Sequence, residues 1–166
     1  MAEIWARLGE VEDPEIPVLS VLDLGIVRDV RWDDDAEGGE CVVTITPTYS
    51  GCPAAEAIAQ AIRAALAVQG IQRVRLVTRI SPAWTTDWLT DDARRKLRAF
   101  GIAPPTHQAI PVSAIGRGPR PAEPRVDCPR CGSVRTALTS QFGSTPCKAL
   151  YRCLDCLEPF DLFKRH

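Results

Sequence analysis

Apolar residues recur at helical spacing in three stretches of the chain, and each stretch predicts a helix. The first stretch covers residues 2–8. The clearest one is the Ala-rich stretch 53–68, which places Ile58 and Ile62 on one face and is followed by a glycine. The third runs over residues 91–100 with an acidic start and a basic end, the arrangement that the helix dipole favours.

Three strands are predicted: alternation of apolar and polar residues marks those over residues 26–32 and 71–80, and a run rich in β-branched residues marks the one over residues 41–46. On the first strand, one buried face is expected to carry Ile26, Val30 and Trp32. The first two strands are expected to pair as a hairpin. A crossover through the Ala-rich helix then leads to the third strand, which predicts an α+β domain of two layers, a three-stranded sheet with helices.

The second half of the chain is rich in proline and cysteine, unlike the first. The sequence therefore divides into three parts. Residues 1–102 form the predicted α+β domain, and the proline-rich stretch 103–125 is typical of a linker or an extended strap. The remaining residues 126–166 are too few to build a hydrophobic core of their own. They contain five of the seven cysteines, so we expect a metal to hold this module together.

Two short cysteine pairs in that module predict a four-cysteine metal ribbon. Cys128 and Cys131 form one knuckle, and Cys153 and Cys156 form the other. Zn²⁺ is the ion expected for four closed thiolates, with an iron–sulfur cluster as the lesser alternative and free or redox-active thiols as a third. The fifth thiol, Cys147, is expected to be a non-ligand, although exchange with a ligand or transient cluster binding stays open.

Charge distribution and targeting signals indicate the compartment and the kinds of partner to expect. The net charge of −1 is split unevenly: residues 1–116 carry 11 Lys or Arg and 16 Asp or Glu, whereas residues 117–166 carry 9 and 5. A basic tail of this kind fits an interaction segment or simply a solvated surface. The sequence shows neither a signal peptide nor an apolar run that could span a bilayer, so we expect a cytoplasmic protein with reduced thiols.

Two further cysteines lie in the N-terminal part. Cys52 stands between Gly51 and Pro53 at the predicted start of the Ala-rich helix, where amides and the helix dipole favour a thiolate. The alternative is a small buried residue at a helix start. Cys41 shares a face with apolar strand residues, which predicts a place in the core.

Few other side chains suggest chemistry. Asp13 and Glu15 flank a proline, and they are expected either to satisfy backbone amides or to bind a metal. Trp84 and Trp88 fit a core role better than a partner-facing patch. The sequence contains no nucleophile–base arrangement, phosphate loop or dinucleotide fingerprint, and so predicts a protein that is not an enzyme.

Several of these segments together resemble a known family. The segments that carry the resemblance are Asp13-Pro14-Glu15-Ile16-Pro17, Asp23-Leu24-Gly25-Ile26-Val27 and Thr44-Ile45-Thr46-Pro47-Thr48, followed by Cys52-Pro53. Residues 1–102 thereby resemble the domain shared by SufT-type iron–sulfur assembly factors and the eukaryotic cytosolic iron–sulfur targeting proteins. With Pro82-Ala83-Trp84-Thr85-Thr86-Asp87-Trp88 and the cysteine tail, the whole chain resembles the PaaD (also called PaaJ) family, encoded with the subunits of the ring-1,2-phenylacetyl-CoA epoxidase.

The resemblance implies an accessory role in aerobic phenylacetate degradation, in maturing the epoxidase and in particular its [2Fe–2S] reductase. By the same resemblance Cys52 matches the family's reactive cysteine, and Asp13 and Glu15 match its acidic motif. A transient iron–sulfur cluster at Cys52 would then need further ligands, either in a homodimer or in a mixed complex with the oxygenase or reductase subunits.

Two other functions remain to be weighed against this one. The first is an adaptor with structural zinc that holds oxygenase and reductase together. The second is a ribbon-type nucleic-acid binder, which the acidic N-terminal part and the lack of a basic aromatic surface argue against. We therefore expect no nucleic-acid or membrane partner.

Overall fold

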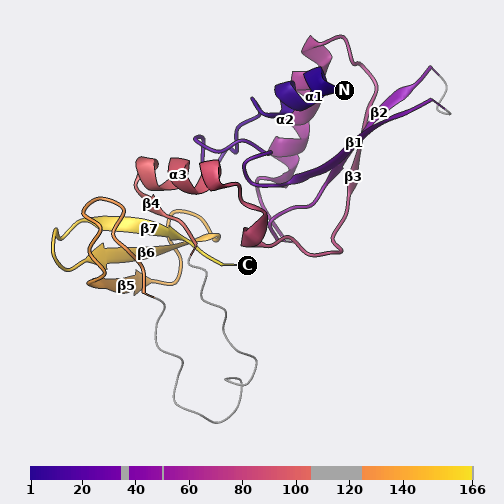
Figure 1. The fold of residues 1–166 in the computed structure, drawn as a ribbon. Coiled ribbons are helices and arrows are strands. Elements are labelled where there is room, and N and C mark those ends of the chain that lie inside the picture. The colour runs from indigo at the N-terminus through magenta and orange to yellow at the C-terminus, as the bar shows by residue number, and fades with distance from the viewer. Residues whose placement is uncertain (35–37, 50, 106–124, 166) are drawn as a thin grey trace. The chain divides into compact units, whose positions relative to one another are not determined.

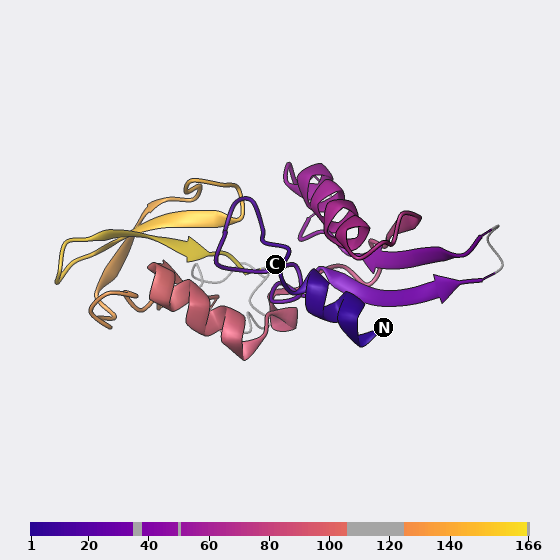
Figure 2. The same ribbon diagram turned by 90° about the horizontal axis from the view of Figure 1, so that it is seen from above.

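The computed structural model describes residues 1–34, 38–49, 51–105 and 125–165. The chain divides into two compact units, residues 1–96 and residues 97–165, which are described separately (Figures 1 and 2). Every helix among these described residues is too short or too polar to cross a membrane.

The first unit contains a three-stranded sheet in the order β1-β2-β3 (Figure 1). Strands β1 (Val27–Asp33) and β2 (Glu40–Ile45) pair antiparallel, as the predicted hairpin requires. Strand β3 (Val74–Thr78) pairs parallel with β2. Helix α2 (Ala55–Val68) makes the crossover between β2 and β3, which confirms the predicted two-layer α+β unit.

Helices form the second layer of this unit. Helix α1 (Ala2–Leu8) contacts α2, and α2 contacts β3. Both helices bury the apolar face that their spacing predicts, and in β2, the central strand, residues 41–45 are all buried. The core therefore lies between helices and sheet, with Leu8, Ile62, Leu66, Val42 and Val43 among its fully buried side chains.

Strand β1 departs from its prediction in two ways, a bulge near its start and an exposed tryptophan near its end. The pairing register shifts between Val27 and Asp29, so Val27 and Val30 are both buried although they lie three positions apart. The inserted residue shifts the alternation at this point only. Beyond it, Trp32 lies two positions after Val30 and so shares its face, but Trp32 was expected to be buried and is 44% exposed.

The segment after β3 is anchored by its two tryptophans. Trp84 is buried, as expected, and its indole N–H donates to the Leu24 carbonyl at 2.8 Å. Trp88 is half-buried, and the Arg28 guanidinium lies 3.6 Å from its ring centroid. The Trp88 backbone passes so close to Gly25 (φ +64°) that a Cβ there would lie 2.9 Å from both the Cβ and the carbonyl oxygen of Trp88.

Asp23 links the first loop to the start of α3 (Asp91–Phe100). Its carboxylate accepts hydrogen bonds from the Ser20 amide at 3.0 Å and from the Lys96 ammonium at 2.8 Å. Burial, the largest influence, would raise the pKa of Asp23, but the hydrogen bonds from Lys96 and Ser20 hold it below its ordinary value. The Thr90 hydroxyl caps α3 by accepting a hydrogen bond from the Ala93 amide at 3.0 Å.

The second unit contains a four-stranded sheet in the order β4-β7-β6-β5. Its strands are β4 (Ile102–Ala103), β5 (Thr136–Ser140), β6 (Lys148–Cys153) and β7 (Pro159–Phe163). Strands β5, β6 and β7 form an antiparallel meander, and β4 joins parallel to β7. The described part of the expected linker begins with Ala103, which pairs in β4; residues 106–124 lie outside the described residues, so the linker itself stays a prediction.

One face of this second sheet carries the core of the unit. The core cluster consists of Ala103, Val126, Cys128, Ala149, Tyr151, Cys153, Phe160 and Leu162. Tyr151 and Phe160 stack with their ring centroids 6.0 Å apart. Because two cysteines belong to this cluster, the small core and the thiol chemistry share the same side of the sheet.

Candidate functional site

Two tight turns present the C-terminal thiols. In the first knuckle the Gly132 amide donates to the Cys128 carbonyl at 2.9 Å, and Gly132 adopts φ +74°. In the second knuckle the Cys156 amide donates to the Cys153 sulfur at 3.5 Å. The residue after this knuckle is Leu157, which adopts φ +65° at the position that corresponds to Gly132. Both knuckles therefore use a left-handed residue to end the turn.

The four sulfur atoms converge on one point in space. The Sγ atoms of Cys128 and Cys156 lie 3.7 Å apart, and those of Cys131 and Cys153 lie 3.6 Å apart. All four lie within 4.8 Å of one another. A tetrahedral ion with metal–sulfur bonds of about 2.3 Å places its sulfurs roughly 3.8 Å apart, so the group fits one ion. The thiolates of an iron–sulfur cluster bind different irons, which spreads some of them farther apart.

The surroundings favour the metal-binding form of at least one thiol. The hydrogen bond from the Cys156 amide is the largest cause that lowers the pKa of Cys153 to about 6, against the opposing effect of burial. Arg135 pairs with Asp155 at 2.7 Å, and Ser133 also donates to Asp155. These contacts join the segment after the first knuckle to the interior of the second, and so hold the two knuckles together without the ion.

Cys147 lies outside this group, as the sequence predicts for a non-ligand. It is buried and its sulfur lies 3.0 Å from the Thr145 hydroxyl oxygen. Its neighbour Lys148 begins β6, so its position is set by the start of a strand rather than by a knuckle.

Cys52 lies in the loop that leads into α2. Its amide donates to the Tyr49 carbonyl at 3.2 Å, and its carbonyl accepts from the Ala55 amide at 3.2 Å. Helix α2 begins at Ala55, later than the predicted start at residue 53, so the thiol precedes the first helical turn. Cys52 is half-buried, so this residue is partly exposed to solvent.

A small cavity borders the same loop. Its volume is about 390 Å³, and it is lined by Thr46, Pro47, Thr48, Tyr49, Ile80, Ala83 and Trp84. The sequence does not predict it, because its walls come from the segment after β2 and from the segment after β3, which only tertiary folding brings together.

The acidic pair and the other thiol of this unit have structural surroundings. The Asp13 carboxylate accepts from the amides of Glu15 and Ile16 at 2.8 Å each, which is the backbone role considered for it. Cys41 is fully buried in β2 as expected, and burial raises the pKa of its thiol. Among the described residues, the four C-terminal cysteines form the one group of three or more His, Cys, Asp or Glu whose ligand atoms meet, so Asp13, Glu15 and Cys52 form no such group.

Two family models match the two units. An iron–sulfur cluster assembly protein model matches residues 1–77. A PaaD zinc beta ribbon domain model matches residues 114–164. The candidate thiol of the first unit and all four converging cysteines of the second fall inside these matches.

Known proteins resemble the chain over the same regions. A protein of Escherichia coli named as a putative subunit of the 1,2-phenylacetyl-CoA epoxidase is 51% identical over 98% of this chain and 91% of its own length. The Fe-S protein maturation auxiliary factor YitW of Bacillus subtilis is 35% identical over 60% of this chain and 91% of its own length. The crystal structure of a DUF59 domain from Bacillus anthracis matches 58% of this chain and 89% of its own chain with a TM-score of 0.51 and 28% identity. The chain therefore belongs to the PaaD family, in which an iron–sulfur cluster assembly domain precedes a zinc beta ribbon.

Proposed function

We propose that this protein is a non-catalytic accessory factor that matures the phenylacetyl-CoA epoxidase system in aerobic phenylacetate degradation. Its task is to deliver an iron–sulfur cluster to a client, the [2Fe–2S] reductase subunit of that system. The E. coli relative is named as an epoxidase subunit, and the relatives of the first unit are named as Fe-S protein maturation auxiliary factors. The protein would work in the cytoplasm, where its thiols stay reduced.

The observation that carries this proposal is the state of the Cys52 thiol. It is half-buried in an irregular loop, next to a glycine, and it does not belong to the four-cysteine group of the second unit. A cargo cluster needs a thiolate that binds and then lets go by ligand exchange. A thiol in a loop can approach a client, whereas Cys41 is enclosed in the core.

One thiol cannot hold a cluster alone, so the remaining ligands must come from outside this unit. We propose that the client supplies them in a transient mixed complex. Asp13 stiffens the loop Asp13–Ile16 through its two amide hydrogen bonds, and in this proposal Asp13 and Glu15 support the approach of the client rather than binding the cluster.

The second unit would hold a resident Zn²⁺ through Cys128, Cys131, Cys153 and Cys156. The sulfur spacing supports a single tetrahedral ion, and a closed four-thiolate site leaves no open position for a substrate. The bound ion supplies only cross-linking, which stabilises a sheet whose core cluster is small.

The test is anaerobic cluster transfer by Cys52→Ala, with Cys41→Ala as the matched control in the same unit. Each zinc-loaded variant is reconstituted with iron and sulfide and mixed with the apo-reductase, and the visible spectrum of the repurified reductase is recorded. We expect Cys52→Ala to lose at least about 90% of the transfer, a tenfold effect, while Cys41→Ala transfers normally. Equal transfer by both variants would contradict the proposal.

The alternative is an adaptor that joins oxygenase and reductase and carries only structural zinc. The close spacing of the four cysteine sulfurs favours this alternative, because four thiolates around one zinc ion form a complete structural site that carries no cluster. An adaptor predicts that Cys52→Ala binds both subunits and leaves the cluster content of the reductase unchanged. The same transfer experiment therefore separates the two functions.

A further inference from the structure

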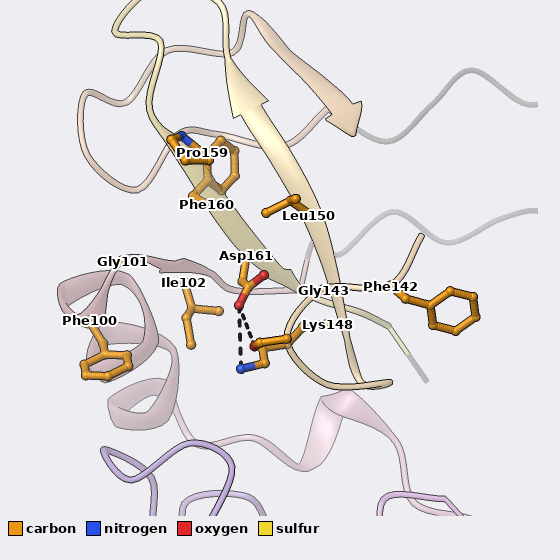
Figure 3. Close-up of a pocket in the computed structure, with 11 residues that line it drawn as sticks. Phe100, Gly101, Ile102, Phe142, Gly143, Lys148, Leu150, Pro159, Phe160 and Asp161 are labelled. Carbon is orange, nitrogen blue, oxygen red and sulfur yellow. Dashed lines mark hydrogen bonds and ion pairs between the residues drawn. The ribbon is translucent and has the colours of Figure 1, made fainter. Parts of the chain in front are cut away.

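A hollow of about 560 Å³ lies on the face of the second sheet that is opposite to its core (Figure 3). In β6 the core cluster takes Ala149 and Tyr151, so the intervening Leu150 faces the other way, and it lines the hollow. In β7 Asp161 does the same. The hollow is therefore separated from the four cysteines by the thickness of the sheet, and it belongs to neither site described above.

The floor of the hollow carries a buried ion pair. Lys148 is only 5% exposed, yet its ammonium lies 3.6 Å from the nearer Asp161 oxygen, which is longer than a good charge-assisted hydrogen bond. The same oxygen accepts from the Ser144 hydroxyl at 3.0 Å. An ammonium has three donors, and within the described residues Asp161 is the only anion paired with this one. Lys148 can therefore donate to a further acceptor that enters the hollow.

In the loop before β6, Gly143 lies close to the Lys148–Asp161 pair. The Gly143 amide donates to the Lys148 carbonyl at 2.8 Å. A Cβ at Gly143 would lie 2.5 Å from an Asp161 oxygen and 3.2 Å from the Lys148 Cβ. Glycine thus permits the loop to close the floor of the hollow at one end.

The walls and the rim are apolar and aromatic. Ile102, Leu150 and Pro159 line the inside. At the rim, Phe100 is 55% exposed and Phe142 is 67% exposed (Figure 3). Exposed aromatic rings around an apolar hollow are typical of a protein-binding surface.

The charge around this hollow is positive. The Lys164 ammonium lies 4.6 Å from the Phe142 ring centroid, so a second cation stands at the rim. Residues 97–165 contain ten Lys or Arg and five Asp or Glu. A four-thiolate zinc site would add a charge of −2, so the unit remains cationic and attracts an acidic partner.

We propose that this hollow, lined by Ile102, Leu150, Pro159 and the Lys148–Asp161 pair between Phe100 and Phe142, is a docking site for an acidic peptide segment of a client protein. One Asp or Glu side chain of that segment enters the hollow and meets the Lys148 ammonium, an apolar side chain packs on the apolar walls beside it, and a second acidic group meets Lys164 at the rim. The proposal rests on the proposed accessory role for the kind of partner, a client protein, but binding here requires neither Cys52 nor a cluster.

The test uses the full-length, zinc-loaded protein labelled with ¹⁵N and two short probe peptides. The acidic probe is Ac-Glu-Leu-Phe-Asp-NH2, and the matched neutral probe is Ac-Gln-Leu-Phe-Asn-NH2. Amide shifts of residues 100–102, 142–150 and 159–161 are followed during titration. We expect saturable shifts at these residues with a Kd of about 1 mM or below, and binding of the neutral probe weaker by about fivefold or more.

Variants separate the contact from bulk charge. Lys148→Met removes the buried ammonium, whereas Arg125→Met removes an exposed cation of the same unit that does not line the hollow. Phe142→Ser removes an exposed rim ring and leaves the core intact. We expect Lys148→Met and Phe142→Ser each to weaken the acidic probe about tenfold, and Arg125→Met to leave it nearly unchanged.

Three results would overturn the proposal: no saturable shifts in these segments, equal binding of the two probes, or an equal loss in Arg125→Met and Lys148→Met. Because Phe142→Ser does not touch the ion pair, it tests the site even if Lys148→Met fails to fold. Failure of cluster transfer by the wild-type protein would refute the proposed function and leave peptide binding as a separate result.

Discussion

Replacing Cys153 by serine tests the assignment of the metal ligands most directly. The Cys153 sulfur lies 3.6 Å from that of Cys131, it accepts a hydrogen bond from the Cys156 amide, and the residue is 0% exposed within the core cluster. A serine hydroxyl does not ionise near neutral pH, so Cys153→Ser leaves three thiolates and a weak fourth donor.

The expected loss of zinc affinity in Cys153→Ser follows from the number of ligands. Structural Zn²⁺ contributes about 10–16 kcal/mol to small zinc modules. Divided equally over four thiolates, the loss of one removes about 2.5–4 kcal/mol, which corresponds to roughly a 10²- to 10³-fold weaker zinc affinity. Because Cys153 also belongs to the core cluster, we expect the second unit of Cys153→Ser to unfold at lower temperature and at lower chelator concentration.

Cys147→Ser is the matched control, since it removes a thiol of the same unit that is also buried but does not belong to the group. Zinc affinity is measured by competition with a chromophoric chelator, and unfolding by circular dichroism with and without EDTA. Cys147→Ser should keep wild-type zinc affinity. The reasoning is refuted if the two variants lose zinc equally, or if Cys153→Ser binds it as tightly as the wild type.

Three further predictions concern stability. Gly25→Ala should lower the free energy of unfolding, measured with urea, by about 2–5 kcal/mol, because the added Cβ combines left-handed strain with a clash against the Trp88 backbone. Gly70→Ala, with φ +81° but open space around it, should lower it by only about 1–2 kcal/mol. Equal losses in the two variants would contradict the clash. Asp23→Asn should cost about 1–3 kcal/mol at neutral pH. Since the pKa of Asp23 is lowered on folding, this cost should shrink as the pH falls below the ordinary value of 3.8; a constant cost would refute the linkage. Leu157→Gly should raise the thermal midpoint by relieving about 1 kcal/mol of left-handed strain, while Leu154→Gly, in the same knuckle, should not; no gain at Leu157 would contradict this.

Most of the local structure of the first unit could be predicted from the residue pattern. Helix α1 matches the predicted range, as does α3, and each strand overlaps its prediction to within three residues at either end. Apolar spacing and capping residues act between near neighbours, so they can be recognised without knowledge of the fold. The two cysteine knuckles could be identified for the same reason, since each brings two sulfurs together within one turn.

Other features depended on contacts between distant segments. The bulge in β1, between Val27 and Asp29, arises from pairing with β2, and no signal in the alternation marks it. The start of α2 was also predicted too early. The proline after Cys52 suggested a helix that begins at residue 53, whereas α2 begins at Ala55 and Cys52 lies in the loop before it. Its role in cluster transfer stays a prediction.

The amino-acid sequence by itself determined the element order, the two-layer first unit and the identity of the four converging cysteines, because these follow from near-neighbour periodicity and from thiol spacing. Only the tertiary structure decided that β4 joins the ribbon sheet and that a buried lysine faces a hollow on the other side of this sheet from the four sulfurs. Each of these depends on which strands become neighbours. That choice is set by burial and pairing summed over the whole unit, so no local pattern records it.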